Sequence, residues 1–163
     1  MLLPKLRITI SEQNDTGAVK TWLWRYRYAK LEVRRLEGEY RELVETQEST
    51  GAIKYDGMPA TGNITDLSDI IVQRDRSLTK LNRAISNMCK VRDEITTAID
   101  QLQYEKEKAV LSYRYIQLRG QFEIRSFQEI ASILGYSESR VKTLHALGLQ
   151  NLSPIIKVST RQY

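Results

Sequence analysis

The sequence has few of the residues that break helices or cross-link a chain. Its 163 residues include 8 glycines, 3 prolines and 1 cysteine. A chain so poor in Gly and Pro favours long helices and makes an extended all-β fold a poor fit. Cys89 cannot form an internal disulfide, which fits a reducing, intracellular setting. Since His145 is the single histidine, the sequence has no Cys/His set for zinc.

Long hydrophobic runs are also missing. No stretch approaches the roughly 18 apolar residues that a membrane span requires, and no signal-peptide core follows Met1 to Lys5. We therefore expect a soluble, cytoplasmic protein.

Charge is abundant but only slightly unbalanced. The chain carries 25 Lys and Arg against 20 Asp and Glu, a net charge of +5. This excess permits a nucleic-acid partner but does not prove one. Much of it lies in one N-terminal stretch, at Lys20, Arg25, Arg27, Lys30, Arg34 and Arg35.

Two long stretches show the alternating three- and four-residue spacing of a coiled-coil seam. The first predicts a helix over residues 17–49, capped by Asp15 or Thr16, and the second predicts a helix from Asp66 to Tyr104. The first seam reads Val19, Trp22, Tyr26, Ala29, Val33, Leu36, Tyr40 and Leu43. The second reads Ile71, Arg74, Leu78, Leu81, Ile85, Met88, Arg92, Ile95, Ile99 and Leu102.

Residues 50–65 separate these helices with two glycines and a proline, which predicts a loop and an antiparallel helical hairpin. Arg74 and Arg92 interrupt the second seam, and we expect them to snorkel or to pair with Glu on the other helix. Trp24 and Tyr28 fall off the first seam. An interface with the C-terminal helices or with a second subunit is favoured for them over base stacking.

The C-terminal part predicts shorter helices with a tight turn between the last two. One amphipathic helix includes Ala109 to Leu118, a second runs from Ser126 to Leu134, and a third from Glu138 to Leu149. Ser126 and Glu129 have the spacing of a capping box.

The window from Phe127 to Ala146 has the spacing of a helix-turn-helix. Ala131 is small where the two helices must nearly touch, and Gly135 can adopt the positive φ of the turn. The positions that should face inward are Ile130, Leu134, Tyr136, Val141 and Leu144.

The start of the third helix is therefore the candidate DNA-contacting surface, because in this motif the second helix enters the major groove. The alternative is a plain solvated helix face. The candidate residues are Ser137, Glu138, Ser139, Arg140, Lys142, Thr143 and His145. For His145 we expect a partly exposed packing or phosphate-contacting role. No catalytic constellation is visible, so we expect no enzyme activity, no cofactor and no metal.

The segment from about Tyr104 to Leu152 resembles region 4 of the sigma-70 family, chiefly over Ser126–Ala131 and Leu134–Leu144. This resemblance implies a promoter-reading helix-turn-helix. Glu138 stands where sigma proteins usually carry arginine and Thr143 where they carry glutamine, so the sigma target sequence does not transfer. No counterpart of sigma region 2 is present, so the chain alone is not expected to melt a promoter.

The whole layout is similar to the phage and prophage transcriptional regulators grouped with ArpU and RinA. The residues that carry this likeness include the loop Tyr55–Pro59 and the stretch Leu111–Ile116. It implies a regulator of late genes in a bacterial host cell, with double-stranded DNA as its partner. From the coiled coil we also expect a homo-oligomer, in which a dimer is favoured, and RNA polymerase is a candidate partner.

The expected organisation is all-α. It has an N-terminal arm over residues 1–16, a hairpin over 17–104, a helix-turn-helix over 105–152 and a tail over 153–163. Two alternative functions remain: a small terminase-like DNA-packaging subunit, and a coiled-coil protein-binding adaptor with a degenerate helix-turn-helix.

Overall fold

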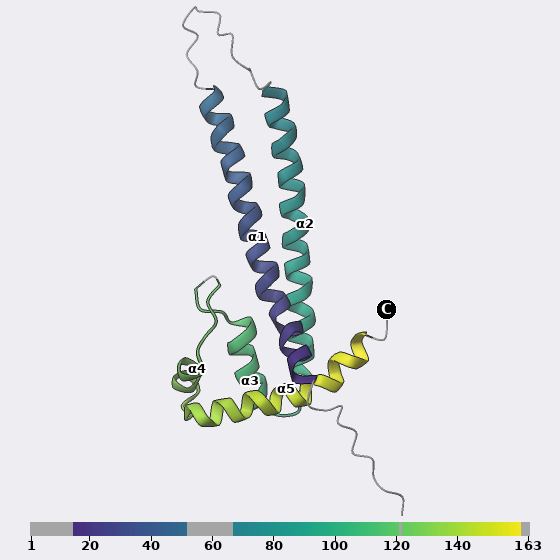
Figure 1. The fold of residues 1–163 in the computed structure, drawn as a ribbon, viewed down its shortest axis with the longest axis vertical. Helices are drawn as coiled ribbons and strands as arrows, with labels where there is room; N and C mark the ends of the chain where they lie inside the picture. The colour runs from purple at the N-terminus through teal and green to yellow at the C-terminus, as the bar shows by residue number, and fades with distance from the viewer. Residues whose placement is uncertain (1–14, 52–66, 121, 161–163) are drawn as a thin grey trace, which may run out of the picture. The chain divides into compact units, whose positions relative to one another are not determined.

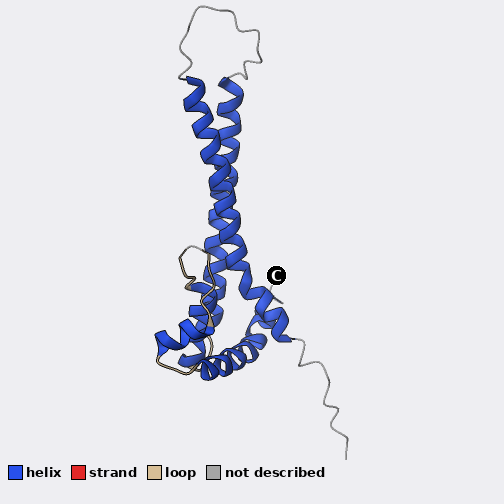
Figure 2. Ribbon diagram, turned by 60° about the vertical axis from the view of Figure 1, so that its left-hand side comes forward, coloured by secondary structure: helices blue, strands red, loops and turns tan. Residues whose placement is uncertain are grey.

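The computed structural model describes residues 15–51, 67–120 and 122–160, and within these ranges the chain is helical without a strand (Figures 1 and 2). The expected all-α class is confirmed. No helix among the described residues is long and apolar enough to cross a membrane. The elements are α1 (Asp15–Gly51), α2 (Leu67–Asp100), α3 (Glu105–Leu111), a π-helical turn η1 (Ser112–Ile116), α4 (Phe127–Leu134) and α5 (Glu138–Thr160).

Helices α1 and α2 form the predicted long hairpin. Of the loop expected over residues 50–65, residues 50–51 belong to α1 and the rest lies outside the described residues, as does most of the N-terminal arm. The chain divides into two compact units, residues 28–91 and residues 1–27 with 92–163. Each long helix therefore contributes to both units.

In the unit of residues 28–91, the α1 seam is confirmed. Val33 and Leu36 on α1 are buried together with Leu81 on α2. Tyr40 on α1 and Met88 on α2 pack against this cluster. The cluster is small because a two-helix hairpin gives each helix a partner on one side only.

The seam predicted on α2 was wrong at two positions and right at its C-terminal end, where Ile95, Ile99 and Leu102 are buried. Ser77 and Val91 are buried, whereas the predicted Leu78 and Arg92 are exposed. At both positions the buried residue is the one that precedes the predicted residue. Either of the two adjacent residues fits the coiled-coil spacing, and the prediction chose Leu78 over Ser77 because leucine is apolar. The buried and half-buried residues along this seam of α2 are Ile70, Arg74, Ser77, Leu81, Ala84, Ile85, Met88, Val91, Ile95, Ala98 and Ile99.

The two arginines of the predicted seam have different environments. Arg74 donates across the hairpin to the Gln47 Oε1 of α1 at 3.0 Å, so it does pair with the other helix, but with an amide and not a carboxylate. Arg92 lies off the seam and pairs with its neighbour Asp93 at 3.2 Å. The expected pairing of Arg92 with a glutamate of α1 is therefore wrong.

The C-terminal helices differ from the predicted ranges at two places. The single helix expected over residues 109–118 is α3 continued by the π-helical turn η1. Helix α5 runs past Leu149 and includes Pro154, so residues 153–160, expected as a separate tail, continue the helix. At the crossing of α5 and α3, a Cβ on Gly148 would lie 3.1 Å from the Leu111 Cδ1, so glycine allows this close approach.

The turn between α4 and α5 has the geometry that the sequence predicts. Gly135 has φ 69° and ψ 33°, the left-handed conformation, and its N–H donates to the Ala131 carbonyl. The N–H of Tyr136 donates to the same carbonyl at 3.0 Å. Together they end α4 and redirect the chain into α5.

We predict that Gly135→Ala destabilises the chain by about 1 kcal/mol, because a Cβ disfavours the left-handed conformation. Gly38, in the middle of α1 with open space around it, is the matched control. Gly38→Ala should stabilise by roughly 0.5 to 1 kcal/mol, since alanine is the better helix former. Urea denaturation measures both, and equal effects of the two substitutions would contradict the prediction.

Candidate nucleic-acid interface

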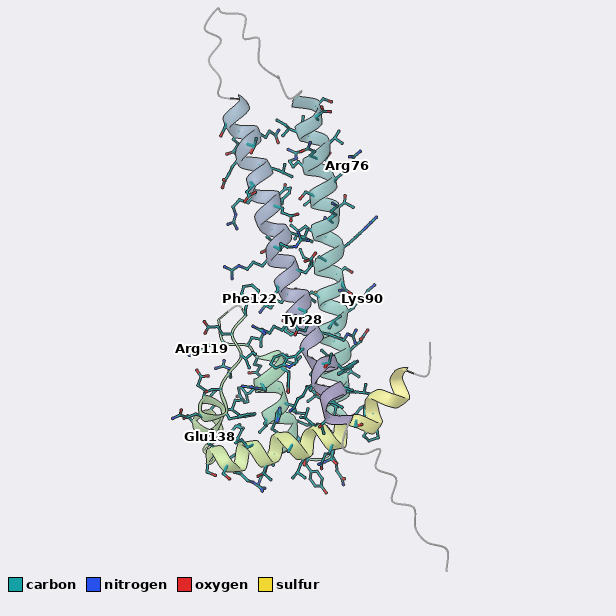
Figure 3. All side chains as sticks on the ribbon, in the orientation of Figure 1. Tyr28, Arg76, Lys90, Arg119, Phe122 and Glu138 are labelled. Carbon is teal, nitrogen blue, oxygen red and sulfur yellow. The ribbon has the colours of Figure 1, made fainter. Side chains whose placement is uncertain are left out.

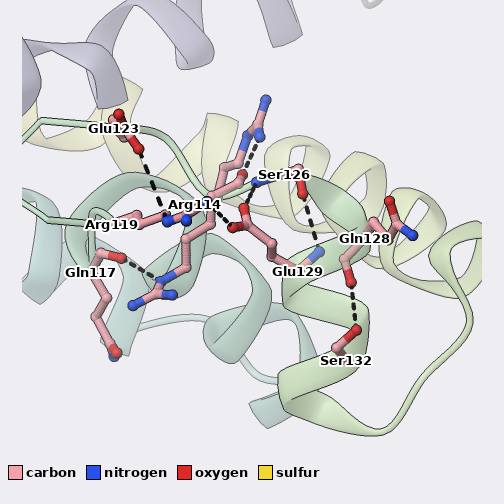
Figure 4. Close-up of polar contacts among 9 residues, drawn as sticks. Arg114, Gln117, Arg119, Glu123, Ser126, Gln128, Glu129 and Ser132 are labelled. Atoms are coloured by element: carbon pink, nitrogen blue, oxygen red, sulfur yellow. Dashed lines mark hydrogen bonds and ion pairs between the residues drawn. The ribbon is translucent and has the colours of Figure 1, made fainter.

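Helix α4 begins with the predicted capping box. The Glu129 N–H donates to the Ser126 Oγ at 3.1 Å, and the Ser126 N–H donates to the Glu129 Oε2 at 2.7 Å (Figure 4). Arg119 adds an ion pair to Glu129 at 2.8 Å. The hydrogen bonds from Ser126, followed by the charge of Arg119, lower the pKa of Glu129. The start of α4 is thus stabilised at neutral pH, where this carboxyl is ionised.

A small apolar core holds α4 and α5 against α3. Its buried residues come from all three helices, and Ala131 is small where α4 and α5 approach each other. They are Val110, Ile130, Ala131, Val141 and Leu144. The other inward positions predicted from the window, Leu134 and Tyr136, pack against this core. Because both helices are anchored on one core, the outer face of α5 has a defined orientation.

The first turns of α5 present a row of exposed polar residues. Ser137 caps the helix by accepting from the Arg140 N–H at 3.2 Å. The exposed candidates of the sequence prediction are Ser137, Glu138, Ser139, Arg140, Lys142 and Thr143. All six residues are exposed at the cap and within the first turns of α5.

The charges on this surface are partly neutralised within the helix. Lys142 pairs with Glu138 one turn earlier, with 2.7 Å between Nζ and Oε1. The Thr143 Oγ1 donates to the Ser139 carbonyl at 3.1 Å. Among the described residues no carboxylate pairs with Arg140. Of the two cations at the start of α5, Lys142 is thus ion-paired and Arg140 is not, among the described residues.

His145 is not part of this surface, which corrects the prediction of a partly exposed residue. Its exposed fraction is 8%, and its Nε2 lies 2.9 Å from the Tyr115 hydroxyl. The Tyr115 ring stacks on the imidazole, and the Phe127 ring meets it edge-on with centroids 5.1 Å apart. His145 thus joins α5 to η1 and α4 from the inside.

Burial sets the protonation of this pair. It lowers the pKa of His145 to about 4, and the positive charges of Arg114 and Lys20 act in the same direction. Burial also raises the pKa of Tyr115 to about 12. At neutral pH both groups are uncharged, so the imidazole and the hydroxyl share one hydrogen bond without a buried charge.

The N-terminal part of α1 packs against η1 and the segment before α4. Trp24 meets Tyr115 edge-on, with ring centroids 4.7 Å apart, and the Arg27 Nε donates to the Phe122 carbonyl at 3.3 Å. For Trp24 the predicted interface with the C-terminal helices is confirmed. Tyr28 is 58% exposed, and the interface predicted for it stays a prediction.

Sequence reasoning missed the role of Arg114. Arg114, labelled in Figure 4, donates to the Arg125 carbonyl. Its guanidinium also lies over the Phe127 ring, 4.5 Å from the ring centroid, and burial lowers its pKa. The residue sits in η1, and a π-helical turn has no recognised sequence signal beyond helical periodicity. These contacts fix the segment that leads into α4, so Arg114 stabilises the start of that helix.

We predict that stability falls on acidification because of His145. Its folded pKa of about 4 lies below the unfolded value near 6.5. The contribution is complete above pH 6.5 and is lost as pH falls toward 4, where the unfolded chain binds a proton that the folded chain does not. From about pH 7.5 to about pH 5, the free energy of unfolding should fall by about 1 to 2 kcal/mol more in the wild type than in His145→Gln. Equal pH dependence in urea denaturation would contradict this.

Comparison with known proteins agrees with this geometry. Residues 98–153 match the family model of sigma-70, region 4. No curated protein and no solved structure matches the chain. The matched residues include α3, η1, α4 and most of α5, so the helix-turn-helix of this chain is similar to sigma-70 region 4.

Proposed function

We propose that this chain is a sequence-specific DNA-binding transcriptional regulator that inserts the start of α5 into the major groove. The observation that carries the proposal is the exposed row from Ser137 to Thr143, held by the α3–α4–α5 core within the segment that matches sigma-70 region 4. Chemically, Arg140 can donate to guanine, Glu138 can accept from cytosine, and Ser139 and Thr143 can contact either bases or phosphates.

The same proposal includes the type of regulator, its partner and its location. The likeness of Leu111–Ile116 and the general layout to the ArpU and RinA regulators supports a phage or prophage regulator of late genes, with RNA polymerase as a candidate partner. We place the protein in the cytoplasm of a bacterial host, where its DNA target would be. The departures at Glu138 and Thr143 support a target sequence different from that of sigma factors.

The deciding experiment selects bound fragments from the genome that surrounds the gene. A regulator should enrich a few intergenic sites, and its affinity for them should fall steeply with salt concentration, because phosphate contacts release counterions. If no fragment is retained at low salt, the proposal fails. Enrichment of a single site together with a ring of many subunits would favour the packaging alternative.

We predict that Arg140→Ala weakens binding to the selected site by roughly 5- to 100-fold, corresponding to one base or phosphate contact of about 1 to 3 kcal/mol. Lys142→Ala should have a smaller effect, because Lys142 already pairs with Glu138. Arg83→Ala, an exposed arginine on α2, is the matched control and should leave the affinity unchanged. Electrophoretic mobility shifts measure all three, and equal losses for Arg140→Ala and Arg83→Ala would contradict the interface.

Glu138 gives a prediction of opposite sign. Glu138→Gln removes a negative charge from the groove-facing surface and releases the Lys142 ammonium from its ion pair (Figure 3 labels Glu138). Binding to unrelated DNA should therefore tighten by a few fold, with a steeper salt dependence. Binding to the selected site relative to unrelated DNA should fall if Glu138 reads cytosine. Fluorescence anisotropy with both DNAs measures the change, and no tightening on unrelated DNA would show that Glu138 lies away from the phosphates.

A further inference from the structure

The first turns of α1 belong to the same compact unit as the helix-turn-helix. That unit includes residues 1–27 together with the C-terminal helices. Val19, Leu23 and Tyr26 of α1 are buried, and Leu23 has no exposed surface at all. These turns of α1 are therefore part of the packed interior of this unit.

A short series of contacts joins this part of α1 to α5. The Trp24 ring meets the Tyr115 ring edge-on, with centroids 4.7 Å apart. The Tyr115 hydroxyl lies 2.9 Å from the His145 Nε2, and these two rings stack with centroids 5.8 Å apart. Tyr115 is buried, so the packed interior leaves it little freedom to shift between its two neighbours. The position of α5 at His145 thus depends on the position of Trp24.

The indole of Trp24 is itself held in place by its surroundings. The Arg27 guanidinium lies over its ring, 5.9 Å from the centroid, and the Arg27 Nε donates to the Phe122 carbonyl at 3.3 Å. On the other side of Trp24 in the sequence, Arg25 forms an ion pair with Glu94 of α2 at 2.9 Å. Because these contacts tie α1 to two other segments, Trp24 presents a fixed edge to Tyr115.

His145 lies close to the exposed row along α5. It follows Thr143 by two residues and Arg140 by five, which is about 3 Å and about 7.5 Å along the helix axis. A shift of the helix at His145 therefore moves these side chains by nearly the same amount. A displacement of about 1 Å is enough to take a donor out of hydrogen-bonding range of a base edge.

We propose that Trp24 is a positioning residue for α5, which acts through Tyr115 and His145 to set the angle at which the exposed row meets the bases. The segment similar to sigma-70 region 4, residues 98–153, contains Tyr115 and His145 but lacks Trp24. The DNA-reading domain of this chain thus includes the first turns of α1 as an additional structural part. This inference rests on the proposed function, because the angle of α5 affects recognition only if α5 reads DNA.

The test compares two tryptophan substitutions in the full-length chain by fluorescence anisotropy. Trp24→Ala should weaken binding to the selected site by about tenfold and change binding to unrelated DNA by less than about twofold, because base contacts depend more on the angle of α5 than phosphate contacts do. Trp24→Phe keeps an aromatic edge and should restore the affinity to within about threefold of the wild type.

Trp22→Ala is the matched control. Trp22 is also half-buried on α1, and the Arg25 guanidinium lies over its ring at 5.6 Å, as Arg27 lies over Trp24. Its substitution should leave the preference for the selected site over unrelated DNA unchanged. Circular dichroism checks that both variants keep their helices.

A second measurement reports on the contacts around α5 directly. His145 is the single histidine of the chain, so its imidazole gives one set of NMR signals whose titration can be followed. Burial lowers its pKa to about 4, with further contributions from the charges of Arg114 and Lys20. Trp24→Ala opens this interior to water and should raise the pKa of His145 toward about 6.5, whereas Trp22→Ala should not.

Tyr115→Phe keeps the test decisive if Trp24→Ala fails to fold. It removes only the hydroxyl that bonds to His145, and the preference for the selected site should fall by about threefold or more. Equal preference in Trp24→Ala and Trp22→Ala, or an unchanged pKa of His145 in Trp24→Ala, would overturn this proposal while the proposed function stands. A wild type that retains no DNA would overturn both.

Discussion

The C-terminal domain depends on the close approach of α4 and α5 at the turn that Gly135 makes. The left-handed backbone there lets the chain reverse within three residues, and Ala131 leaves room for the two helices to meet over Val110. This packing holds the exposed row that starts at Ser137 at a defined angle.

A second group of contacts stiffens the same domain from the inside. Tyr115, His145 and Trp24 come from η1, α5 and α1, and they meet through aromatic edges, one stacked pair and one hydrogen bond. All three groups are uncharged at neutral pH, so no buried charge has to be compensated. These contacts extend the matched sigma-70 segment by the first turns of α1, which precede it by about 70 residues in the chain and do not belong to it.

The hairpin in residues 28–91 is stabilised differently from the C-terminal helices. Its buried cluster is small, and α2 has a stripe of apolar residues wider than one helix partner can cover. Long helices of this kind gain most of their stability from tertiary packing.

The sequence by itself determined the features that depend on local spacing. The all-α class, the hairpin, the capping box at Ser126 and the turn at Gly135 all followed from residues close together in the chain, where backbone geometry leaves few alternatives. The six exposed candidates from Ser137 to Thr143 were also found in this way, since helical periodicity distinguishes outward from inward positions.

Only the tertiary structure decided which of two equivalent local readings applied. Leu78 and Ser77 were both compatible with a seam, and hydrophobicity favoured the wrong one, because the fit between two helices depends on side-chain size as well as polarity. His145 was predicted partly exposed, but Tyr115 and Phe127, distant in sequence, enclose it. The physical reason is the same in both cases: periodicity specifies the face of a helix, whereas burial depends on what other parts of the chain bring to that face.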